Sequence, residues 1–159
     1  MIDATAHIGC DTVFLAKYYK ITSGVSFEIC ERVYRLLSEN ISRADLDHIV
    51  KPTLGSCVDG IDSLTRKYDL LYLDPPWGGR NYRSEVKMNL SLDDIPVTTL
   101  IHRWLKDERC EVLLYKTPLN IDQDQVKQAA PFGWNVESNN IIDSDKKKDS
   151  FMLWLFYKL

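Results

Sequence analysis

The chain has 159 residues, 45% of them apolar and 27% charged, and a net charge of −3. This is the balance of a globular protein, and the length suits a single domain over residues 1–159. Proteins that hold long nucleic acids by their phosphates rely on clustered Lys and Arg, so the charge argues against that class. It leaves open a pocket that takes one nucleotide of an RNA end.

The sequence predicts neither secretion nor membrane insertion. Met1-Ile2-Asp3 shows no basic region followed by an apolar stretch, and the longest apolar run, Phe151 to Tyr157, is too short to span a bilayer. The four cysteines form no C-x-x-C pair and no zinc-binding cluster with histidine. We therefore expect free thiols in a reducing, intracellular compartment, and no metal.

Short helices and strands alternate along the chain. In chain order we expect a helix over 12–19, a strand within 21–27, a helix over 28–40, strands at 49–54 and 69–73, a helix over 91–106, a strand at 111–116, a helix over 122–130, and a hairpin of strands 135–142 and 150–157. Ser91 would cap its helix, with Asp93 and Asp94 in the first turn. The lysine-rich turn 146–148 of the hairpin is expected in solvent.

This alternation predicts an α/β fold: a mostly parallel sheet with helices on both faces, ending in an antiparallel hairpin. In such sheets ligands bind at the carboxyl ends of the strands, near the point where the strand order reverses. The segments that follow strands are therefore the candidates for a site: 3–12, 26–28, 57–60, 74–82 and 116–120.

The most informative segment is Asp74-Pro75-Pro76-Trp77-Gly78-Gly79, directly after an apolar strand. Two prolines remove two N–H groups, so the carbonyls of Asp74 and Pro75 are free to face a ligand. A carboxylate beside a carbonyl can accept both hydrogens of an exocyclic amine, and Trp77 can lie against a base. The alternative is a rigid surface turn whose Trp packs into the core.

Three other positions are candidates for binding a cofactor. Residues 3–12 occupy the first strand-to-helix turn, which is glycine-rich in cofactor-binding α/β folds but here keeps only Gly9. Glu28 could bind ribose hydroxyls or instead favour the dipole of its helix. Asp59 could accept a hydrogen bond from an adenine amine or only stabilise a turn.

These segments resemble the trimethylguanosine synthases, class I S-adenosylmethionine-dependent methyltransferases that act on RNA cap guanine. The family motif D-A-F-C-G-V-G-G-N-T is matched by D-A-T-A-H-I-G-C-D-T from Asp3 to Thr12, and S-P-P-W-G-G by D-P-P-W-G-G from Asp74 to Gly79. A proline followed by Asn and an I-D-Q-V segment is matched from Pro118 onwards. P-P-W-G-G is fairly specific, whereas D-P-P-W alone is shared with adenine N6 methyltransferases. The likeness covers nearly the whole chain.

The resemblance implies a Rossmann-like class I methyltransferase fold and S-adenosyl-L-methionine as cofactor. The implied cofactor-binding residues are Asp3, His7, Gly9, Glu28 (or Ser26 beside it), Asp59 and Asp74. The implied substrate-binding residues are Trp77, Asp74, Pro118 and Asn120, with Asp74 and Pro75 as the catalytic pair.

The chain also departs from the family pattern. Two glycines of the first loop are His7 and Cys10, and Asp74 stands where the family has serine. Because the chain begins at the first strand, the family's N-terminal extension is expected to be missing.

The function implied by the resemblance is methyl transfer to the exocyclic N2 amine of a 7-methylguanosine cap. The partner would be capped RNA and the protein a monomer, located in the nucleus if cellular, or in the host cytoplasm or the virion if viral. Two alternatives stay open: an adenine N6 methyltransferase acting on RNA or DNA, and a methyltransferase-like domain that binds without catalysing, which the eroded glycine loop would fit.

Overall fold

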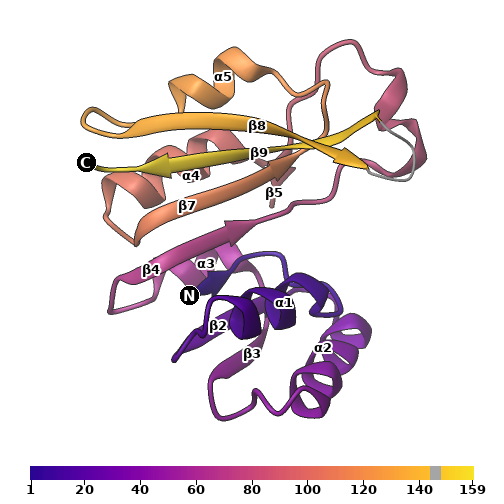
Figure 1. Ribbon diagram of the computed structural model, residues 1–159, viewed down its shortest axis with the longest axis vertical. Helices are drawn as coiled ribbons and strands as arrows, with labels where there is room; N and C mark the ends of the chain where they lie inside the picture. Colours follow the sequence, from indigo (N-terminus) through magenta and orange to yellow (C-terminus); the bar gives the residue numbers. More distant parts are fainter. Residues whose placement is uncertain (144–147) are drawn as a thin grey trace.

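The computed structural model describes residues 1–143 and 148–159, and the side chains of 80, 81, 143, 148 and 149 lie outside this description (Figure 1). The expected lysine-rich turn falls mostly on 144–147, outside the described residues. Among the described residues, no helix is long and apolar enough to cross a membrane.

A seven-stranded sheet forms the centre of the protein, in the order β3-β2-β1-β4-β7-β9-β8 (Figure 1). Its strands are β1 (Ile2–Asp3), β2 (Gly24–Glu28), β3 (Val50–Leu54), β4 (Tyr68–Leu73), β7 (Cys110–Thr117), β8 (Asn135–Asp143) and β9 (Lys148–Tyr157). The first five in spatial order are parallel, and β9 runs antiparallel to both β7 and β8. The expected parallel sheet with a C-terminal antiparallel hairpin is confirmed.

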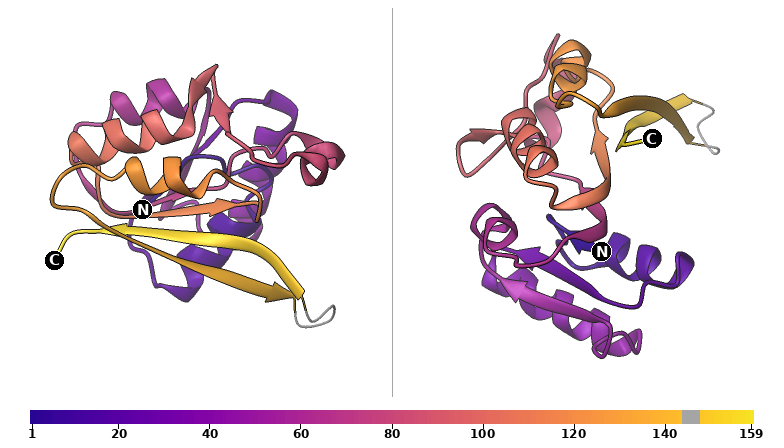
Figure 2. Two further views of the ribbon diagram at one scale, coloured as in Figure 1. Left: turned by 90° about the horizontal axis from the view of Figure 1, so that it is seen from above. Right: turned by 90° about the vertical axis from the view of Figure 1, so that its left-hand side faces the viewer.

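Helices cover both faces of the sheet (Figure 2). They are α1 (Cys10–Tyr18), α2 (Glu31–Arg43), α3 (Cys57–Asp62), α4 (Val97–Lys106) and α5 (Gln123–Gln128). Residues of α3, α4 and α5 pack into one apolar core, and residues of α1 and α2 pack into a second. Strand β4 contributes Leu71 and Leu73 to the first core and Tyr72 to the second, because successive side chains of a strand point to opposite faces.

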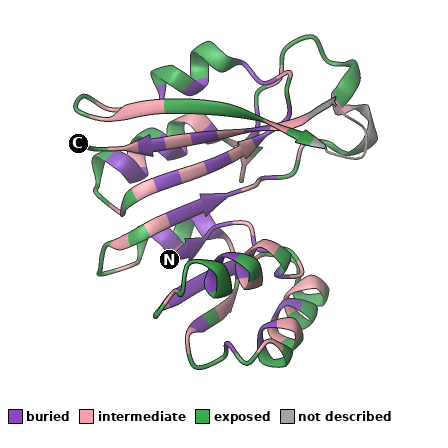
Figure 3. Cartoon of the chain, viewed as in Figure 1, coloured by how far each residue is buried: buried purple, intermediate pink, exposed green. Residues whose placement is uncertain are grey.

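Burial falls off from the centre of the sheet to its edges (Figure 3). The middle strand β4 ends in three buried residues, whereas much of the edge strand β8 is exposed. Strand β3 forms the other edge and contains Pro52, which registers with Ser26 of β2. An edge strand tolerates proline because one of its sides needs no hydrogen-bond donor.

The helix expected to begin at Ser91 begins instead at Val97, so that prediction is wrong. Ser91 belongs to a short antiparallel pair, β5 (Ser91–Leu92) with β6 (Ile95–Pro96), and Pro96 is the residue that precedes α4. Asp93 and Asp94 make the tight turn between the two strands, both with positive φ (49° and 62°). Aspartate is one of the few residues other than glycine that adopt this conformation readily.

Candidate functional site

A cleft of about 710 Å³ opens at the carboxyl ends of the parallel strands. Five segments line it: the loop after β1, the end of β2, the start of α3, the turn after β4, and the β5–β6 turn. The strand order reverses between β1 and β4, so the loops that leave these two neighbours diverge. This is the position where open α/β sheets bind their ligands.

The loop after β1 is held by backbone hydrogen bonds and by side chains, among them that of Asn40. Ala6 N–H donates to the Phe27 carbonyl at 2.9 Å, and Asn40 of α2 donates to the Ile8 carbonyl at 2.8 Å. His7, which lines the cleft, has φ 49°, a left-handed conformation that favours glycine. The fold keeps a glycine-type turn here although the glycine itself has been replaced.

Gly9 is needed for packing and is not among the residues that line the cleft. Its φ is 90°, and a Cβ placed on it would lie 2.8 Å from Leu37 Cδ1 of α2. Gly9 therefore lets α1 and α2 approach each other, and its implied part in cofactor binding stays a prediction. Its place at the start of α1 is the one the sequence predicted.

Asp3 is completely buried beneath the loop and does not line the cleft. Its carboxylate accepts hydrogen bonds from the Thr12 hydroxyl at 2.5 Å and from the Thr5 N–H at 3.2 Å. Burial raises the pKa of Asp3 to about 7, with Asp11 and Asp74 adding to the rise and the two hydrogen bonds opposing it. Asp3 therefore fixes the loop from below.

Glu28 lines the cleft at the end of β2. Its Oε1 accepts a hydrogen bond from the Cys30 N–H at 2.7 Å, just before α2. The alternative, Ser26, is completely buried within β2 and does not line the cleft. Of the two, only Glu28 lines the cleft, and its binding of ribose stays a prediction.

Asp59 is not among the residues that line the cleft, and its contact with an adenine amine stays a prediction. It lies in the first turn of α3, where its side chain is exposed. Two other residues line the cleft near this place: Ser56, which caps α3 by accepting from the Val58 N–H at 3.1 Å, and Asp93. The Ser56 hydroxyl donates to the Asp93 carboxylate, which joins the β5–β6 turn to the start of α3.

Asp74 follows β4 and lines the cleft together with Pro75. Its N–H donates to Thr5 Oγ1 at 2.8 Å, and its Oδ2 accepts from Lys116 Nζ of β7 at 2.8 Å. Burial raises the pKa of Asp74 above its ordinary value of 3.8, and the hydrogen bond and charge of Lys116 counteract only part of that rise. The turn that the sequence singled out thus places a partly buried acid, Asp74, where β1, β4 and β7 come together.

Trp77 is half-buried: it lines the cleft and also packs against the larger apolar core. Its ring meets Tyr82 edge-on, with the centroids 5.4 Å apart at 73°. Its indole Nε1 is buried and meets no acceptor at hydrogen-bonding geometry among the described residues. The indole N–H nevertheless contributes to lowering the pKa of the Asp74 carboxyl. The expected ligand-facing role and the alternative packing role therefore coexist.

Pro118 and Asn120 are not among the residues that line the cleft, and their implied contact with substrate stays a prediction. Pro118 is buried. Asn120 Nδ2 donates to the carbonyls of Tyr82 and Glu85, each at 2.8 Å, and so holds the segment around the 3-10 helix Gly79–Ser84. Asn120 reaches the cleft only through Tyr82.

Two polar residues of the cleft, Ser56 and Asp93, fall outside the segments that the sequence singled out. Three more residues lie inside those segments but were given no role: Asp11 and Tyr82, which line the cleft, and Lys116, which lies behind Asp74. Ser56 could have been found, because it follows β3 closely. Asp93 was missed because Ser91 was assigned as a helix cap.

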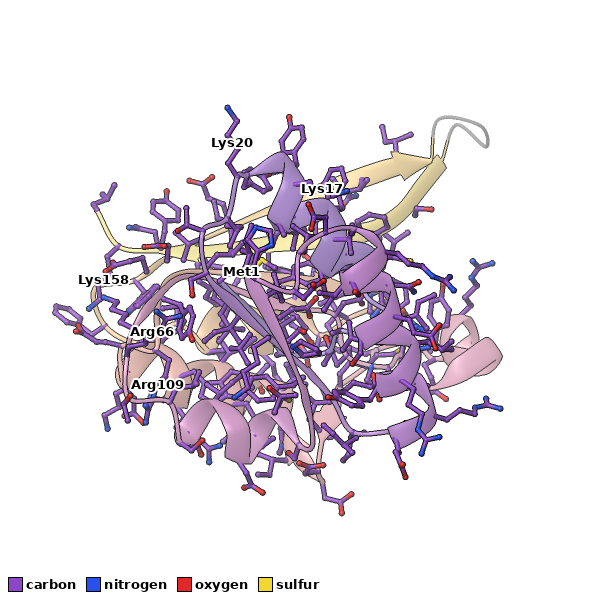
Figure 4. The ribbon with its side chains drawn as sticks, turned by 90° about the horizontal axis from the view of Figure 1, so that it is seen from below. Met1, Lys17, Lys20, Arg66, Arg109 and Lys158 are labelled. Atoms are coloured by element: carbon purple, nitrogen blue, oxygen red, sulfur yellow. The ribbon has the colours of Figure 1, made fainter. Side chains whose placement is uncertain are left out.

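Basic side chains gather at the opposite end of the sheet. Figure 4 shows Arg66, Arg109 and Lys158 along one edge of the molecule; Arg109 directly precedes β7, and Arg66 lies two residues before β4. Arg109 donates to the Leu64 carbonyl at 2.7 Å, and Lys158 pairs with Glu108 at 2.6 Å. These cations lie at the amino ends of the strands, so we assign them no part in binding a ligand in the cleft.

A family model described as "RNA cap guanine-N2 methyltransferase" matches residues 1–148. The chain belongs to this family. It is 26% identical, over 144 residues, to an uncharacterized protein of Acanthamoeba polyphaga mimivirus. That match covers 88% of this chain and 56% of the relative, so the chain spans about half the length of that relative.

Solved structures share the fold at low sequence identity. An O-methyltransferase from Bacillus cereus in complex with SAH has a TM-score of 0.68 at 14% identity, covering 99% of this chain and 73% of that one. A proposed rRNA methylase from Clostridium thermocellum has a TM-score of 0.66 at 12% identity, covering 99% and 87%. The fold is therefore that of the class I S-adenosylmethionine-dependent methyltransferases.

The cleft suits the family's cofactor, S-adenosyl-L-methionine. Its volume lies within the range of small-molecule sites, roughly 300–1,000 Å³. The backbone of the first loop, the carboxylate of Glu28 and the apolar side chains of Ile29 and Leu92 line it together. A carboxylate can accept hydrogen bonds from ribose hydroxyls, and apolar side chains can pack against a base. These are the two kinds of contact that a nucleoside requires.

Proposed function

We propose that this protein methylates the exocyclic N2 amine of the 7-methylguanosine cap of RNA. One observation carries the proposal: the Asp74–Pro75–Trp77 turn lies at the cleft beside the first loop, at the reversal of strand order. The family match supports guanine N2 of a cap as the acceptor. The acidic net charge fits recognition of one nucleotide better than a grip on long RNA.

The residues of the turn divide the work between orientation and stacking. The Asp74 carboxylate and the Pro75 carbonyl would accept the two hydrogens of the amine, which directs the nitrogen lone pair. Trp77 would stack on the base, whose positive charge adds a cation–π attraction of roughly 0.5–2 kcal/mol. Rate would come mainly from alignment, which can supply several kcal/mol of the barrier.

The cofactor would be held by the first loop and Glu28, and when bound it supplies a methyl group on a positively charged sulfur. Backbone from Ala4 to Ile8 would approach it closely, because Asp3 and Asn40 hold this loop in place. Once the amine nitrogen is alkylated it loses one proton to solvent. Asp74 acts in this scheme as a hydrogen-bond acceptor and not as a strong base.

The test is a methyl-transfer assay on the purified chain with three acceptors: N7-methylated cap, unmethylated cap, and an uncapped RNA rich in adenine. Product nucleosides would be separated by chromatography and identified by mass spectrometry. N2,7-dimethylguanosine formed from the N7-methylated cap, with no N2-methylguanosine from the unmethylated cap, supports the proposal. Methylated adenine would favour the adenine enzyme, which also uses D-P-P-W.

Absence of product with every acceptor contradicts the proposal. Calorimetric titration with S-adenosylhomocysteine then divides the remaining cases. Binding without turnover would indicate a cleft that holds the cofactor but lacks its acceptor, and no binding would indicate a degenerate domain.

A further inference from the structure

Lys116 begins segment 116–120, which the sequence singled out, but neither the sequence pattern nor the family motifs gave this cation a role. It lies near the end of β7, next to β4, and its Nζ is 2.8 Å from Asp74 Oδ2 and 3.5 Å from Asp11 Oδ2. From the other side its Nζ lies 5.1 Å from the centre of the Phe151 ring of β9. Only 21% of its side chain is exposed. Such a lysine is fixed from three elements.

Asp74 needs a cation because its surroundings are acidic. The titratable groups that act on it or feel its charge are Asp3 of β1, Asp11 of α1, Tyr72 of β4, and Tyr115 and Lys116 of β7. Within the described residues, Lys116 is the one cation in this set. Asp11 itself is held by the Tyr72 hydroxyl, which donates to its Oδ2 at 2.7 Å.

We propose that Lys116 is a positioning residue for methyl transfer: it holds the Asp74 carboxylate ionised and in one orientation, so that the carboxylate can accept the hydrogens of the target amine. This inference rests on the proposed function for its chemistry, though not for its geometry. The contact is made by Oδ2, which leaves Oδ1 for a ligand in the cleft. Asp74 paired with Lys116 thus replaces a neutral serine of the family motif.

The electrostatic consequence has a defined sign. Burial disfavours the charged form of Asp74, and Lys116 favours it, so removing the cation must raise the pKa of Asp74 further. Catalysis that needs the carboxylate is lost as the pH falls through that pKa. The acidic limb of the pH profile should therefore move to higher pH when Lys116 is made neutral.

The experiment compares Lys116→Met, which removes the charge but keeps the length, with Lys116→Arg, which keeps the charge. Lys67→Met is the matched control: Lys67 pairs with Glu111 at 2.8 Å across the same two strands, at the far end of the sheet. The pKa of Asp74 is measured by carbon NMR of aspartate-labelled protein, with the signal assigned by its loss in Asp74→Asn. The pH dependence of kcat/KM is measured on the same proteins.

We expect the pKa of Asp74 to rise by a unit or more in Lys116→Met, to stay near the parent value in Lys116→Arg, and to be unchanged in Lys67→Met. A rise of one unit lowers kcat/KM about tenfold at pH values well below it and leaves the alkaline plateau intact. Binding of S-adenosylhomocysteine should not change. If Lys116→Met does not fold, Lys116→Gln takes its place in the same measurements, because glutamine is also neutral but can form hydrogen bonds.

An unchanged pKa of Asp74 in the neutral variant would overturn the role of Lys116. Equal losses of kcat/KM at every pH, together with a lowered melting temperature, would also overturn it, since that is the behaviour of a structural residue. The NMR measurement needs no acceptor, so it decides the matter even if the parent protein methylates no cap and the proposed function fails.

Discussion

Asp74 stands where the family motif has serine, in the turn that we propose binds the target amine. Replacing it by alanine should lower kcat at least tenfold and change the affinity for the cap much less, because the loss falls on the reacting geometry. Asp74→Ser restores the family's residue and should keep activity. Single-turnover rates and cap affinities of both variants check this. An Asp74→Ala protein as active as the parent would contradict the role of the carboxylate.

The half-buried position of Trp77 sets two expectations for Trp77→Ala. Loss of a stacking partner should abolish the preference for the charged 7-methylguanine base, which we expect to be about fivefold in the parent for ~1 kcal/mol of cation–π attraction. Loss of packing should also cost stability, toward the low end of the 3–5 kcal/mol typical of buried aromatics, because the ring is partly exposed. Trp77→Phe should fall between on both measures.

Fluorescence titration with methylated and unmethylated cap analogues, run beside thermal melts, separates the two effects. Equal affinity of the parent for both analogues would count against the cap as substrate. A melting loss with the preference intact in Trp77→Ala would make Trp77 a packing residue only.

At the scale of single elements, two asparagines hold the two halves of the cleft. Asn120 donates to the carbonyls of Tyr82 and Glu85, in the segment that we propose binds the substrate, and Asn40 donates to the Ile8 carbonyl, in the loop that we propose binds the cofactor. Each bond ties an irregular segment to the fold. Because each amide reaches only one side, the two substitutions to alanine should have separable effects.

Asn120→Ala should weaken cap binding and leave the affinity for S-adenosylhomocysteine near that of the parent. Asn40→Ala should do the reverse. The stability cost in each case is expected at about 1–3 kcal/mol, since partly buried carbonyls lose their donor. Hydrogen exchange would show which loop is released, around 79–88 or around 4–9. Loss of both affinities in both variants would refute this division.

Elements were also the scale at which sequence reasoning worked best. The strong apolar periodicity of the second helix and the apolar run before Asp74 predicted α2 and β4 to within a few residues. The β5–β6 turn was missed because Ser91, Asp93 and Asp94 satisfy the rules for a helix start. Pro96 keeps those residues out of the helix and pairs with Ser91 in the β5–β6 ribbon. Strands of two residues leave no periodic pattern in the sequence.

The candidate site was predictable where it depends on order along the chain and not where it depends on packing. Asp74 directly follows β4, Trp77 lies three residues further on, and Glu28 ends β2, so topology places all three at the cleft. Asp59 also comes after a strand, but it lies in the first turn of α3 and is not among the residues that line the cleft. Lys116 contacts Asp74 only because β7 lies beside β4, a pairing that single-sequence patterns do not reveal.

At the scale of the whole molecule, the buried Asp3 links folding to pH. Its pKa is raised to about 7 in the folded protein, mainly by burial, whereas an unfolded chain keeps a value near 3.8. The folded state therefore binds the proton more tightly than the unfolded state. Its contribution to stability is fully present below about pH 4 and is lost as the pH rises through about 7.

Asp3→Asn should remove this dependence. The amide can still accept from the Thr5 N–H, and it can donate to the Thr12 hydroxyl in place of accepting from it. The variant should approach the parent near pH 4, and its advantage should grow as the pH rises to about 7, reaching an amount on the order of a few kcal/mol, since each pKa unit corresponds to about 1.4 kcal/mol. Urea unfolding at pH 5, 6.5 and 8 measures the difference, with Asp69→Asn, an exposed strand carboxylate, as control. Parallel stability curves for Asp3→Asn and the parent would show that Asp3 is ionised throughout and compensated by its two donors, and the pH dependence of folding would then have to arise elsewhere.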